Sequence, residues 1–221
     1  MDIKKNIDKN NKIIDDINQY LHNKGVNINS RLDVIINVLN NNINNECEEN
    51  VKSMIDSIFI DKSELCQRLY MSLGSQLHKQ KLDQFYTPCT IGKFISSIIL
   101  NGKCIIDPAC GTGDLVIDCN SIKTTLWDIS TSVLELTKLN YKFRSKTITN
   151  LIQIDSIYHN NKDNKSYDYC MLNPPFGNKT VITDSKILNK YNLEKKLKKQ
   201  EIGILFIERA LNLLNNNGIL F

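Results

Sequence analysis

Residues 103–114, KCIIDPACGTGD, decide the fold of this chain. The first five residues are mainly apolar and end in the acid Asp107, which is the pattern of a short buried strand. A Gly-x-Gly turn follows at once, and Gly111 and Gly113 let the backbone pass close to a ligand. The turn is not a phosphate-binding P-loop, because no Gly-Lys-Ser/Thr follows it, and Val116 fills the third glycine position of a dinucleotide fingerprint. The stretch therefore predicts a strand that leads into a ligand-binding turn of a different kind.

Strands and helices alternate along the rest of the C-terminal part. Strands are predicted at residues 103–107, 124–128, 150–155 and 167–172, with the first residues of a fifth strand at 218–221. Helices are predicted at residues 114–120, 130–141 and 201–214. This alternation is typical of an α/β fold with a mostly parallel sheet, whose ligand site lies beyond the carboxyl ends of the strands.

The N-terminal part, residues 1 to about 75, has the apolar spacing of helices. Ser30 and either Asp61 or Ser63 are suited to begin two of these helices, and Gly74 is suited to end the last one. No catalytic group of side chains is apparent in this part of the sequence. We therefore expect a helical N-terminal domain at residues 1–80, accessory in role, followed by the α/β domain at residues 81–221.

The composition fits a globular protein of one domain, or of one domain with a small companion: 221 residues, 41% of them hydrophobic, with a net charge of +4. That charge is compatible with nucleic acid binding but does not establish it. No apolar run approaches the roughly 20 residues of a membrane helix. The N-terminus also lacks the apolar segment of a secretion signal, so we expect a soluble, cytoplasmic protein with no membrane partner. The seven cysteines form no CxxC pair, which favours reduced, buried thiols over a metal site or a disulfide framework.

Acids close three consecutive predicted strands, at Asp107, Asp128 and Asp155. Asp128 lies 21 positions after Asp107, where a carboxylate can accept hydrogen bonds from both ribose hydroxyls of a nucleoside. Asp155 is placed to accept from an exocyclic amine. Asp107 and Asp114 flank the glycine turn, which disfavours a pyrophosphate and suits a ligand with an ammonium group or hydroxyls. Each acid alone is more often a helix cap or a turn residue, but the three together favour a nucleoside site.

A second motif, Asn173-Pro174-Pro175-Phe176-Gly177, follows the fourth predicted strand. The two prolines stiffen the backbone and remove two N–H donors, which leaves carbonyl groups that only accept. The side chain of Asn173 adds another carbonyl acceptor. The motif therefore offers rigid acceptors for an amino group, beside an aromatic ring for stacking.

These motifs, together with Gln84-Phe85-Tyr86-Thr87-Pro88, resemble the S-adenosylmethionine-dependent DNA adenine-N6 methyltransferases of the gamma motif order. This family includes the modification subunit of type I restriction-modification systems. The resemblance covers residues 60–221, roughly, with the motifs in the family's order. It implies a Rossmann-like methyltransferase sheet, S-adenosylmethionine as cofactor, DNA as substrate and a separate specificity subunit as partner.

The resemblance also implies a role for individual residues. The methionine end of the cofactor would be held by Gln84, Phe85, Tyr86, Thr87, Pro88, Cys89, Asp107, Ala109, Gly111, Thr112 and Gly113. Asp128 would bind the ribose hydroxyls, Ile129 would pack on the adenine, and Asp155 would bind the cofactor's exocyclic amine. The catalytic pocket would consist of Asn173, Pro174, Pro175 and Phe176, with no metal.

The chemistry of such a pocket is simple. The N6 lone pair of adenine is delocalised into the ring and is a weak nucleophile. Asn173 and the Pro174 carbonyl would accept its hydrogens and stabilise the positive charge that grows on the nitrogen, while Phe176 stacks on the base. A base inside a duplex is out of reach, so the target adenine is expected to be flipped out.

The resemblance leaves alternatives open. The chain ends at Phe221, as the fifth predicted strand begins, whereas the family's sheet continues with two more strands. We therefore expect a C-terminally incomplete sheet, completed by a separate part or a partner.

The lysine-rich segment at residues 178–200 either contacts phosphates or is a solvated loop. Glutamine and RNA amino-group methyltransferases share the Asn-Pro-Pro-aromatic motif, and a non-catalytic cofactor-binding remnant is a third hypothesis. A panel of substrates distinguishes a DNA adenine methyltransferase from a glutamine or RNA amino-group methyltransferase. The retention of all the motifs is evidence against a non-catalytic remnant.

Overall fold

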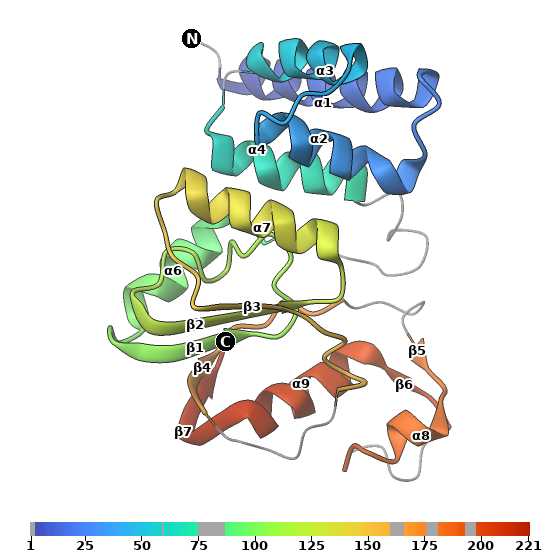
Figure 1. The fold of residues 1–221 in the computed structure, drawn as a ribbon. Coiled ribbons are helices and arrows are strands. Elements are labelled where there is room, and N and C mark those ends of the chain that lie inside the picture. The colour runs from blue at the N-terminus through green and yellow to red at the C-terminus, as the bar shows by residue number, and fades with distance from the viewer. Residues whose placement is uncertain (1–2, 59, 75–86, 160–165, 176–180, 193–197) are drawn as a thin grey trace.

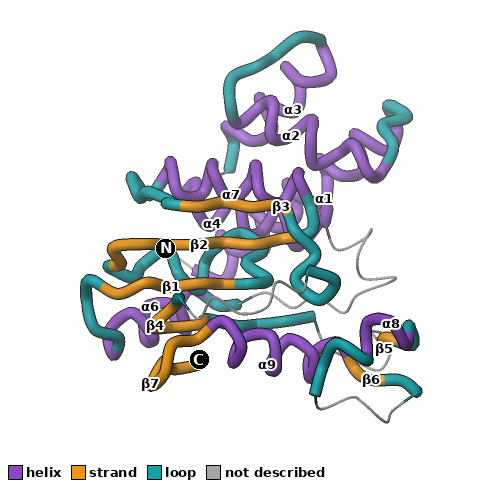
Figure 2. The backbone as a smooth tube through the Cα atoms, turned by 60° about the horizontal axis from the view of Figure 1, so that its bottom comes forward, coloured by secondary structure: helices purple, strands orange, loops and turns teal. Residues whose placement is uncertain are grey.

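The computed structural model describes residues 3–58, 60–74, 87–159, 166–175, 181–192 and 198–221. Its centre is a five-stranded sheet in the order β3-β2-β1-β4-β7, in which every strand pair is parallel (Figure 1). The strands are β1 (Lys103–Asp107), β2 (Ser121–Asp128), β3 (Asn150–Gln153), β4 (Tyr167–Cys170) and β7 (Leu214–Leu220). Figure 2 shows the strands one beside the other in this order. The prediction of a parallel α/β sheet is confirmed.

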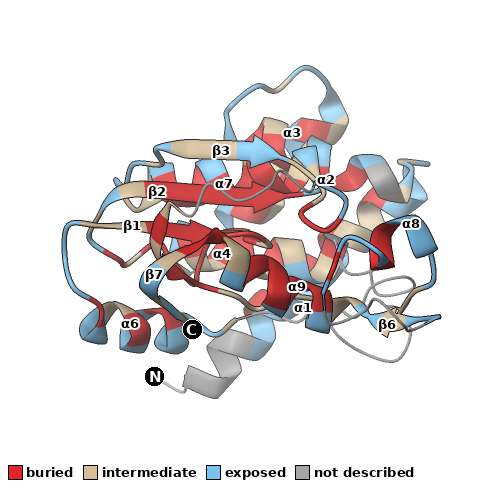
Figure 3. Cartoon of the chain, turned by 90° about the horizontal axis from the view of Figure 1, so that it is seen from below, coloured by how far each residue is buried: buried red, intermediate tan, exposed pale blue. Residues whose placement is uncertain are grey.

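Helices pack on both faces of the sheet, because alternate strand residues point to opposite sides. These helices are α6 (Cys89–Ile98), α7 (Thr131–Phe143) and α9 (Ile202–Leu213). Ile105 and Leu126 belong to a core shared with α6 and α7, whereas their neighbours Ile106 and Trp127 face α9. The second halves of β1 and β2 are therefore buried, as the red segments of Figure 3 show.

A small antiparallel sheet lies beside α9 (Figure 1). It consists of β5 (Val181–Ile182) and β6 (Gln200–Glu201), and the short helix α8 (Ser185–Leu188) accompanies it. Ile187 and Leu188 of α8 pack with Leu205 and Phe206 of α9 in one buried cluster. This cluster attaches the small sheet to the main one.

The N-terminal part is helical, as predicted. Its elements are α1 (Ile3–Asn23), a 3-10 turn (Ile28–Ser30), α2 (Arg31–Leu39), α3 (Glu46–Asp56), α4 (Lys62–Leu69) and a π-helical turn (Tyr70–Gly74). Asp61 caps α4 by accepting from the Ser63 N–H at 2.8 Å, while Ser30 precedes α2 without a side-chain cap. Cys66 of α4 is buried with Leu136 and Leu139 of α7, so these helices pack directly on the α/β part.

The predicted helix at residues 114–120 is wrong, because residues 114–118 form successive turns between β1 and β2, and residues 119–120 are irregular. Leu115, Val116 and Ile117 are consecutive and all buried, so the segment has no exposed face for the polar side of an amphipathic helix. Gly92 of α6 packs closely on it: a Cβ at this glycine would stand 2.4 Å from the carbonyl oxygen of Asp114.

Several predicted bounds also shift. The last strand covers Leu214–Leu220 rather than 218–221, because α9 ends at Leu213 and passes directly into it. β3 ends at Gln153, although the N–H of Ile154 still donates to the Asp128 carbonyl at 2.9 Å. In the described part of the chain, none of the helices has the length and apolarity to cross a membrane.

Candidate functional site

A cleft opens at the carboxyl end of the sheet, beside β1 and β4, where the strand order reverses. The space between its walls is about 580 Å³, including the open mouth. The residues predicted from the sequence that line it are Thr87, Asp107, Ala109, Gly111, Thr112, Asp128, Asn173 and Pro175. The structure thus brings the glycine turn, the second-strand acid and the Asn-Pro-Pro motif to one cleft.

Two carboxylates accept hydrogen bonds from the backbone of the glycine turn. Asp107, at the end of β1, accepts from the Ala109 N–H at 3.0 Å through Oδ1. Asp128, at the end of β2, accepts from the Gly111 N–H at 3.1 Å through Oδ2 and from the Ser130 N–H at 2.9 Å through Oδ1. Each carboxylate oxygen has two lone pairs, so these bonds leave capacity for ligand hydroxyls.

Helix α7 holds the glycine turn from behind. Thr137 Oγ1 donates to the Gly111 carbonyl at 2.7 Å, and Asn140 Nδ2 donates to the Thr112 carbonyl at 2.8 Å. Gly113 has φ +80°, and a Cβ there would stand 2.8 Å from the ring of Tyr141. A glycine is therefore required at position 113 for both its backbone conformation and its packing on α7.

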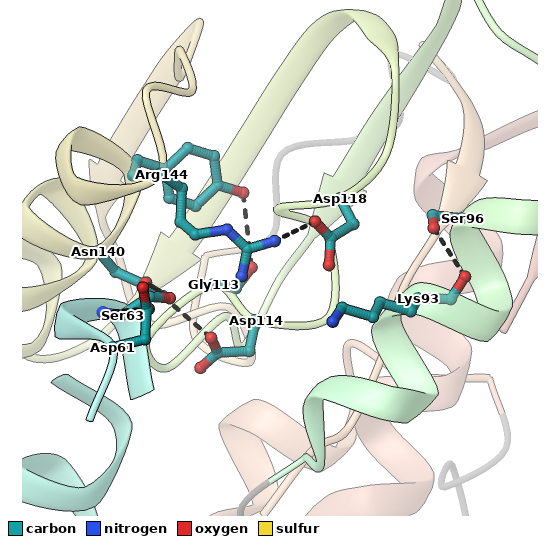
Figure 4. A network of polar contacts seen from close by, with 10 residues as sticks. Asp61, Ser63, Lys93, Ser96, Gly113, Asp114, Asp118, Asn140 and Arg144 are labelled. Carbon is teal, nitrogen blue, oxygen red and sulfur yellow. Dashed lines mark hydrogen bonds and ion pairs between the residues drawn. The ribbon is translucent and has the colours of Figure 1, made fainter. Parts of the chain in front are cut away.

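A buried polar network joins the turn to helix α4 (Figure 4). Asp114 accepts from Asn140 Nδ2 at 3.0 Å and from the hydroxyl of Thr112, and Gln67 of α4 also bonds to it. The hydroxyl of Ser63, also in α4, donates to Asn140 Oδ1. The N-terminal helices and the glycine turn are thus linked through fully buried side chains.

The acids of the cleft are buried, which disfavours their charged forms. Burial raises the pKa of Asp107 to about 7 and that of Asp128 to about 6, although backbone N–H groups bonded to each carboxylate oppose the shift. The pKa of Asp114 is raised for the same reason. No Lys or Arg belongs to the described lining of this cleft. Such carboxylates gain most from a ligand that brings positive charge and hydroxyl donors.

Asn173 connects the Asn-Pro-Pro motif to the start of α6. Its Nδ2 donates to Oγ1 of Thr87 at 2.8 Å, across a separation of 86 residues. The bond orients the amide of Asn173, because its nitrogen faces Thr87 and its carbonyl oxygen points away from it. The segment that contains Thr87 and the Asn-Pro-Pro motif, which are far apart in the sequence, therefore meet in the cleft.

Other predicted site residues lie elsewhere or outside the described residues. Gly113 belongs to the glycine turn but packs on α7 and is not in the described lining. Pro88 and Cys89 are exposed at the start of α6, and Ile129 is 50% exposed. Asp155 caps its own turn by accepting from the N–H groups of Ile157 and Tyr158 at 3.0 and 3.1 Å, and neither it nor Pro174 belongs to the described lining. The predictions for Gln84, Phe85, Tyr86 and Phe176 fall outside the described residues.

Among the residues that the structure covers, no group of three His, Cys, Asp or Glu side chains is suited to a metal ion.

Sequence reasoning missed several residues of the site. Tyr70, Cys110 and Leu115 line the cleft, and Thr137 and Asn140 support it from α7. Thr137 and Asn140 stand three positions apart, so they share one face of the helix with apolar residues, and that signal was available in the sequence. Tyr70 gave no comparable signal, because an aromatic residue in an amphipathic helix is usually a core residue.

Comparison with known families gives one match over most of the chain. The model of the family described as N-6 DNA Methylase matches residues 69–220. The matched region includes the five strands and the described cleft.

Solved structures with a similar fold are methyltransferases by description. A Listeria monocytogenes protein described as a class I S-adenosylmethionine-dependent methyltransferase has a TM-score of 0.68 at 17% identity, covering 98% of this chain and 72% of that one. The methyltransferase subunit of a type I restriction-modification system from Streptococcus thermophilus has a TM-score of 0.53 at 15% identity, covering 79% and 42%. A Vibrio vulnificus protein described as the modification subunit of a type I restriction enzyme gives 0.52 at 20% identity, covering 77% and 40%. The chain thus spans less than half the length of the two type I subunits.

Proposed function

Since the chain belongs to the N-6 DNA methylase family, we propose that its cleft binds S-adenosylmethionine and that its site transfers the methyl group to N6 of an adenine in DNA. One observation carries this proposal: Asp107, Asp128 and Asn173 line the same cleft. Carboxylates suited to an ammonium group and ribose hydroxyls therefore stand beside an amide suited to bind an amino group.

The residues present fit the cofactor. S-adenosylmethionine carries an ammonium group and two ribose hydroxyls, and when bound it supplies a methyl group activated on a sulfonium sulfur. Asp107 is 2% exposed and Asp128 8%, and a cationic ligand would favour the ionised form of both. We assign the ribose hydroxyls to Asp128 and the methionine end to Asp107, Gly111 and Thr112. Asp155 stays a proposed partner of the exocyclic amine, through the oxygen that its own turn does not use.

The target amino group would be held by acceptors of the Asn-Pro-Pro motif. The bond from Asn173 Nδ2 to Thr87 supports this role, because it turns the carbonyl oxygen of Asn173 away from Thr87. The Pro174 carbonyl would be the second acceptor, and Phe176 the stacking ring. Two acceptors on one amino group stabilise the charge that develops on nitrogen during methyl transfer.

The partners follow from the same proposal. DNA would be the substrate, and a specificity subunit or a separate C-terminal part would complete the assembly, as two of the similar structures are type I subunits. The division into a helical domain at residues 1–80 and a methyltransferase core at residues 81–221 is part of this proposal, as is a cytoplasmic location.

Methyl transfer from labelled S-adenosylmethionine tests the proposal. The substrates are duplex DNA, the same duplex with N6-methyladenine at every adenine, RNA, and a glutamine peptide. We expect label only in the unmodified DNA, with an Asn173→Ala loss of at least about 100-fold, the scale of one lost transition-state acceptor. Label in RNA or in the peptide instead would favour the amino-group alternatives. Saturable cofactor binding with no transfer to any substrate, in the presence of a specificity subunit, would favour the remnant.

A further inference from the structure

We infer that Tyr70 is a cofactor-contacting residue, whose ring forms the part of the cleft wall beside Gly111 and Asp128 and faces the cofactor's positive charge. The inference rests on the proposed function. It extends the cofactor site into the N-terminal helices, for which the sequence predicted only an accessory role.

The geometry places Tyr70 against the glycine turn. Tyr70 lines the same cleft as Gly111 and Asp128. A Cβ at Gly111 would stand 3.8 Å from Cε1 of the Tyr70 ring, which is van der Waals contact. Gly111 in turn donates its N–H to Asp128 at 3.1 Å. The ring, the glycine and the carboxylate therefore stand next to one another at one place in the wall.

The chemistry of S-adenosylmethionine indicates which of its atoms would lie against this part of the cleft wall. The atom of S-adenosylmethionine that joins the methionine chain to the ribose is the sulfonium sulfur. We assign the methionine chain to Gly111 and the ribose to Asp128, so a ring beside these two neighbouring residues faces the charged sulfur. The face of an aromatic ring attracts a cation, and this attraction is strongest where water is excluded.

The N-terminal helices hold the ring in position. Tyr70 begins the π-helical turn that follows α4, and such turns are frequent at functional sites. It packs against the cluster in which Cys66 of α4 meets Leu136 of α7. The bonds from Ser63 to Asn140 and from Gln67 to Asp114 fix α4 to the glycine turn. Burial and the charge of Asp128 both raise the pKa of Tyr70, so the phenol stays protonated and adds no charge of its own.

The test compares two ligands and two substitutions. S-adenosylmethionine and S-adenosylhomocysteine, which lacks the sulfonium charge, are titrated into the full chain and its Tyr70→Phe and Tyr70→Ala variants. Tyr20→Ala is the matched control, because Tyr20 is also a half-buried tyrosine of the N-terminal helices but bonds to Asn50, away from the cleft. Asp128→Ala serves as the reference for the proposed function, and circular dichroism confirms that each variant is folded.

We expect Tyr70→Ala to weaken S-adenosylmethionine binding about tenfold and S-adenosylhomocysteine binding no more than about threefold. Tyr70→Phe keeps the ring and should bind both ligands within about twofold of the wild type. If Tyr70→Ala binds as the wild type does while Asp128→Ala does not, the inference fails and the proposed function stands. Equal losses for the two ligands would overturn the contact with the sulfonium. Absence of saturable binding to the folded wild type would overturn both the proposed function and this inference.

Discussion

The backbone N–H of Gly111 donates to Oδ2 of Asp128 at 3.1 Å, so the glycine turn after β1 and the carboxylate at the end of β2 form one unit. The other oxygen of the same carboxylate accepts from the Ser130 N–H at 2.9 Å, where α7 begins. Asp128 thus fixes the relative position of two strand ends and a helix before any ligand is bound.

Gly113→Ala should destabilise the fold more than the same change at another glycine with positive φ. At Gly113 the new Cβ adds the strain of φ +80° to an approach of 2.8 Å to Tyr141, whereas Gly25, with φ +74°, has no atom within 4 Å of that position. We expect a loss of about 2–4 kcal/mol in the free energy of unfolding at Gly113 and about 1 kcal/mol at Gly25. Urea unfolding measures both, and equal losses would contradict the packing of the turn on α7.

Asn140→Ala should be more harmful than Ser63→Ala. Asn140 donates to both the Thr112 carbonyl and the buried carboxylate of Asp114, while Ser63 contributes one hydroxyl to the same network. We expect losses of about 2–4 and about 1 kcal/mol in the free energy of unfolding, since removing Asn140 leaves buried acceptors unsatisfied. The double variant should lose less than the sum, because the Ser63 bond needs Asn140. Strict additivity would argue against the network.

Thr87 is expected to act as a positioning residue for Asn173. Thr87→Val removes the oxygen that accepts from Asn173 Nδ2 and should lower kcat for methyl transfer about tenfold, while Thr87→Ser keeps that oxygen and should restore it. Cofactor affinity should change less than kcat in both variants. A Thr87→Ser variant as impaired as Thr87→Val would show that the hydroxyl of residue 87 is not sufficient to position Asn173, and would contradict this role.

The raised pKa values of Asp107, about 7, and Asp128, about 6, predict opposite pH trends for folding and for binding. Between pH 4 and 7, about the window from the unfolded to the folded pKa values, the native state binds more protons than the unfolded state. Stability of the ligand-free chain from these two groups therefore falls as pH rises. Binding of a cation requires the ionised carboxylates, so affinity for S-adenosylmethionine should rise over the same range, with release of protons.

Calorimetry at pH 6.5 in buffers of different ionisation enthalpy measures this proton release. Chemical unfolding between pH 4 and 8 measures the stability trend. Asp107→Asn should reduce the fall in stability with rising pH at the upper end of this range, near the pKa of Asp107. Proton uptake on binding, or stability that rises with pH in the Asp107-dependent part, would contradict the burial of ionisable carboxylates in the cleft.

Much of the fold could be predicted from local sequence. The strand before the glycine turn, the acid at the end of β2 and the helix predicted at residues 130–141 are each set by neighbouring residues, and the structure has them close to where the pattern indicated. The segment at residues 114–120 failed because its form depends on tertiary packing: α6 covers it so closely that Gly92 touches the Asp114 backbone.

The site was predicted less completely, for a physical reason. A motif identifies residues near one another in sequence, such as Asp107 and Gly111. The second layer comes from distant elements: Thr137 and Asn140 reach the turn only because α7 packs behind it, and Tyr70 only because α4 packs on α7. Asp155, which the sequence predicted at the end of a strand, instead lies beyond β3 and bonds to its own turn.

The most direct test of the account is a calorimetric titration of the chain with S-adenosylmethionine, beside Asp128→Ala and Asp184→Ala. Both aspartates accept a backbone N–H two residues ahead, from Ser130 and Lys186, but Asp184 caps α8 and is not a residue of the cleft. We predict saturable binding that Asp184→Ala preserves and Asp128→Ala weakens by at least about 100-fold, as expected when a buried carboxylate loses two ligand hydrogen bonds. Equal affinity in the wild type and Asp128→Ala would contradict the assignment of this cleft to the cofactor.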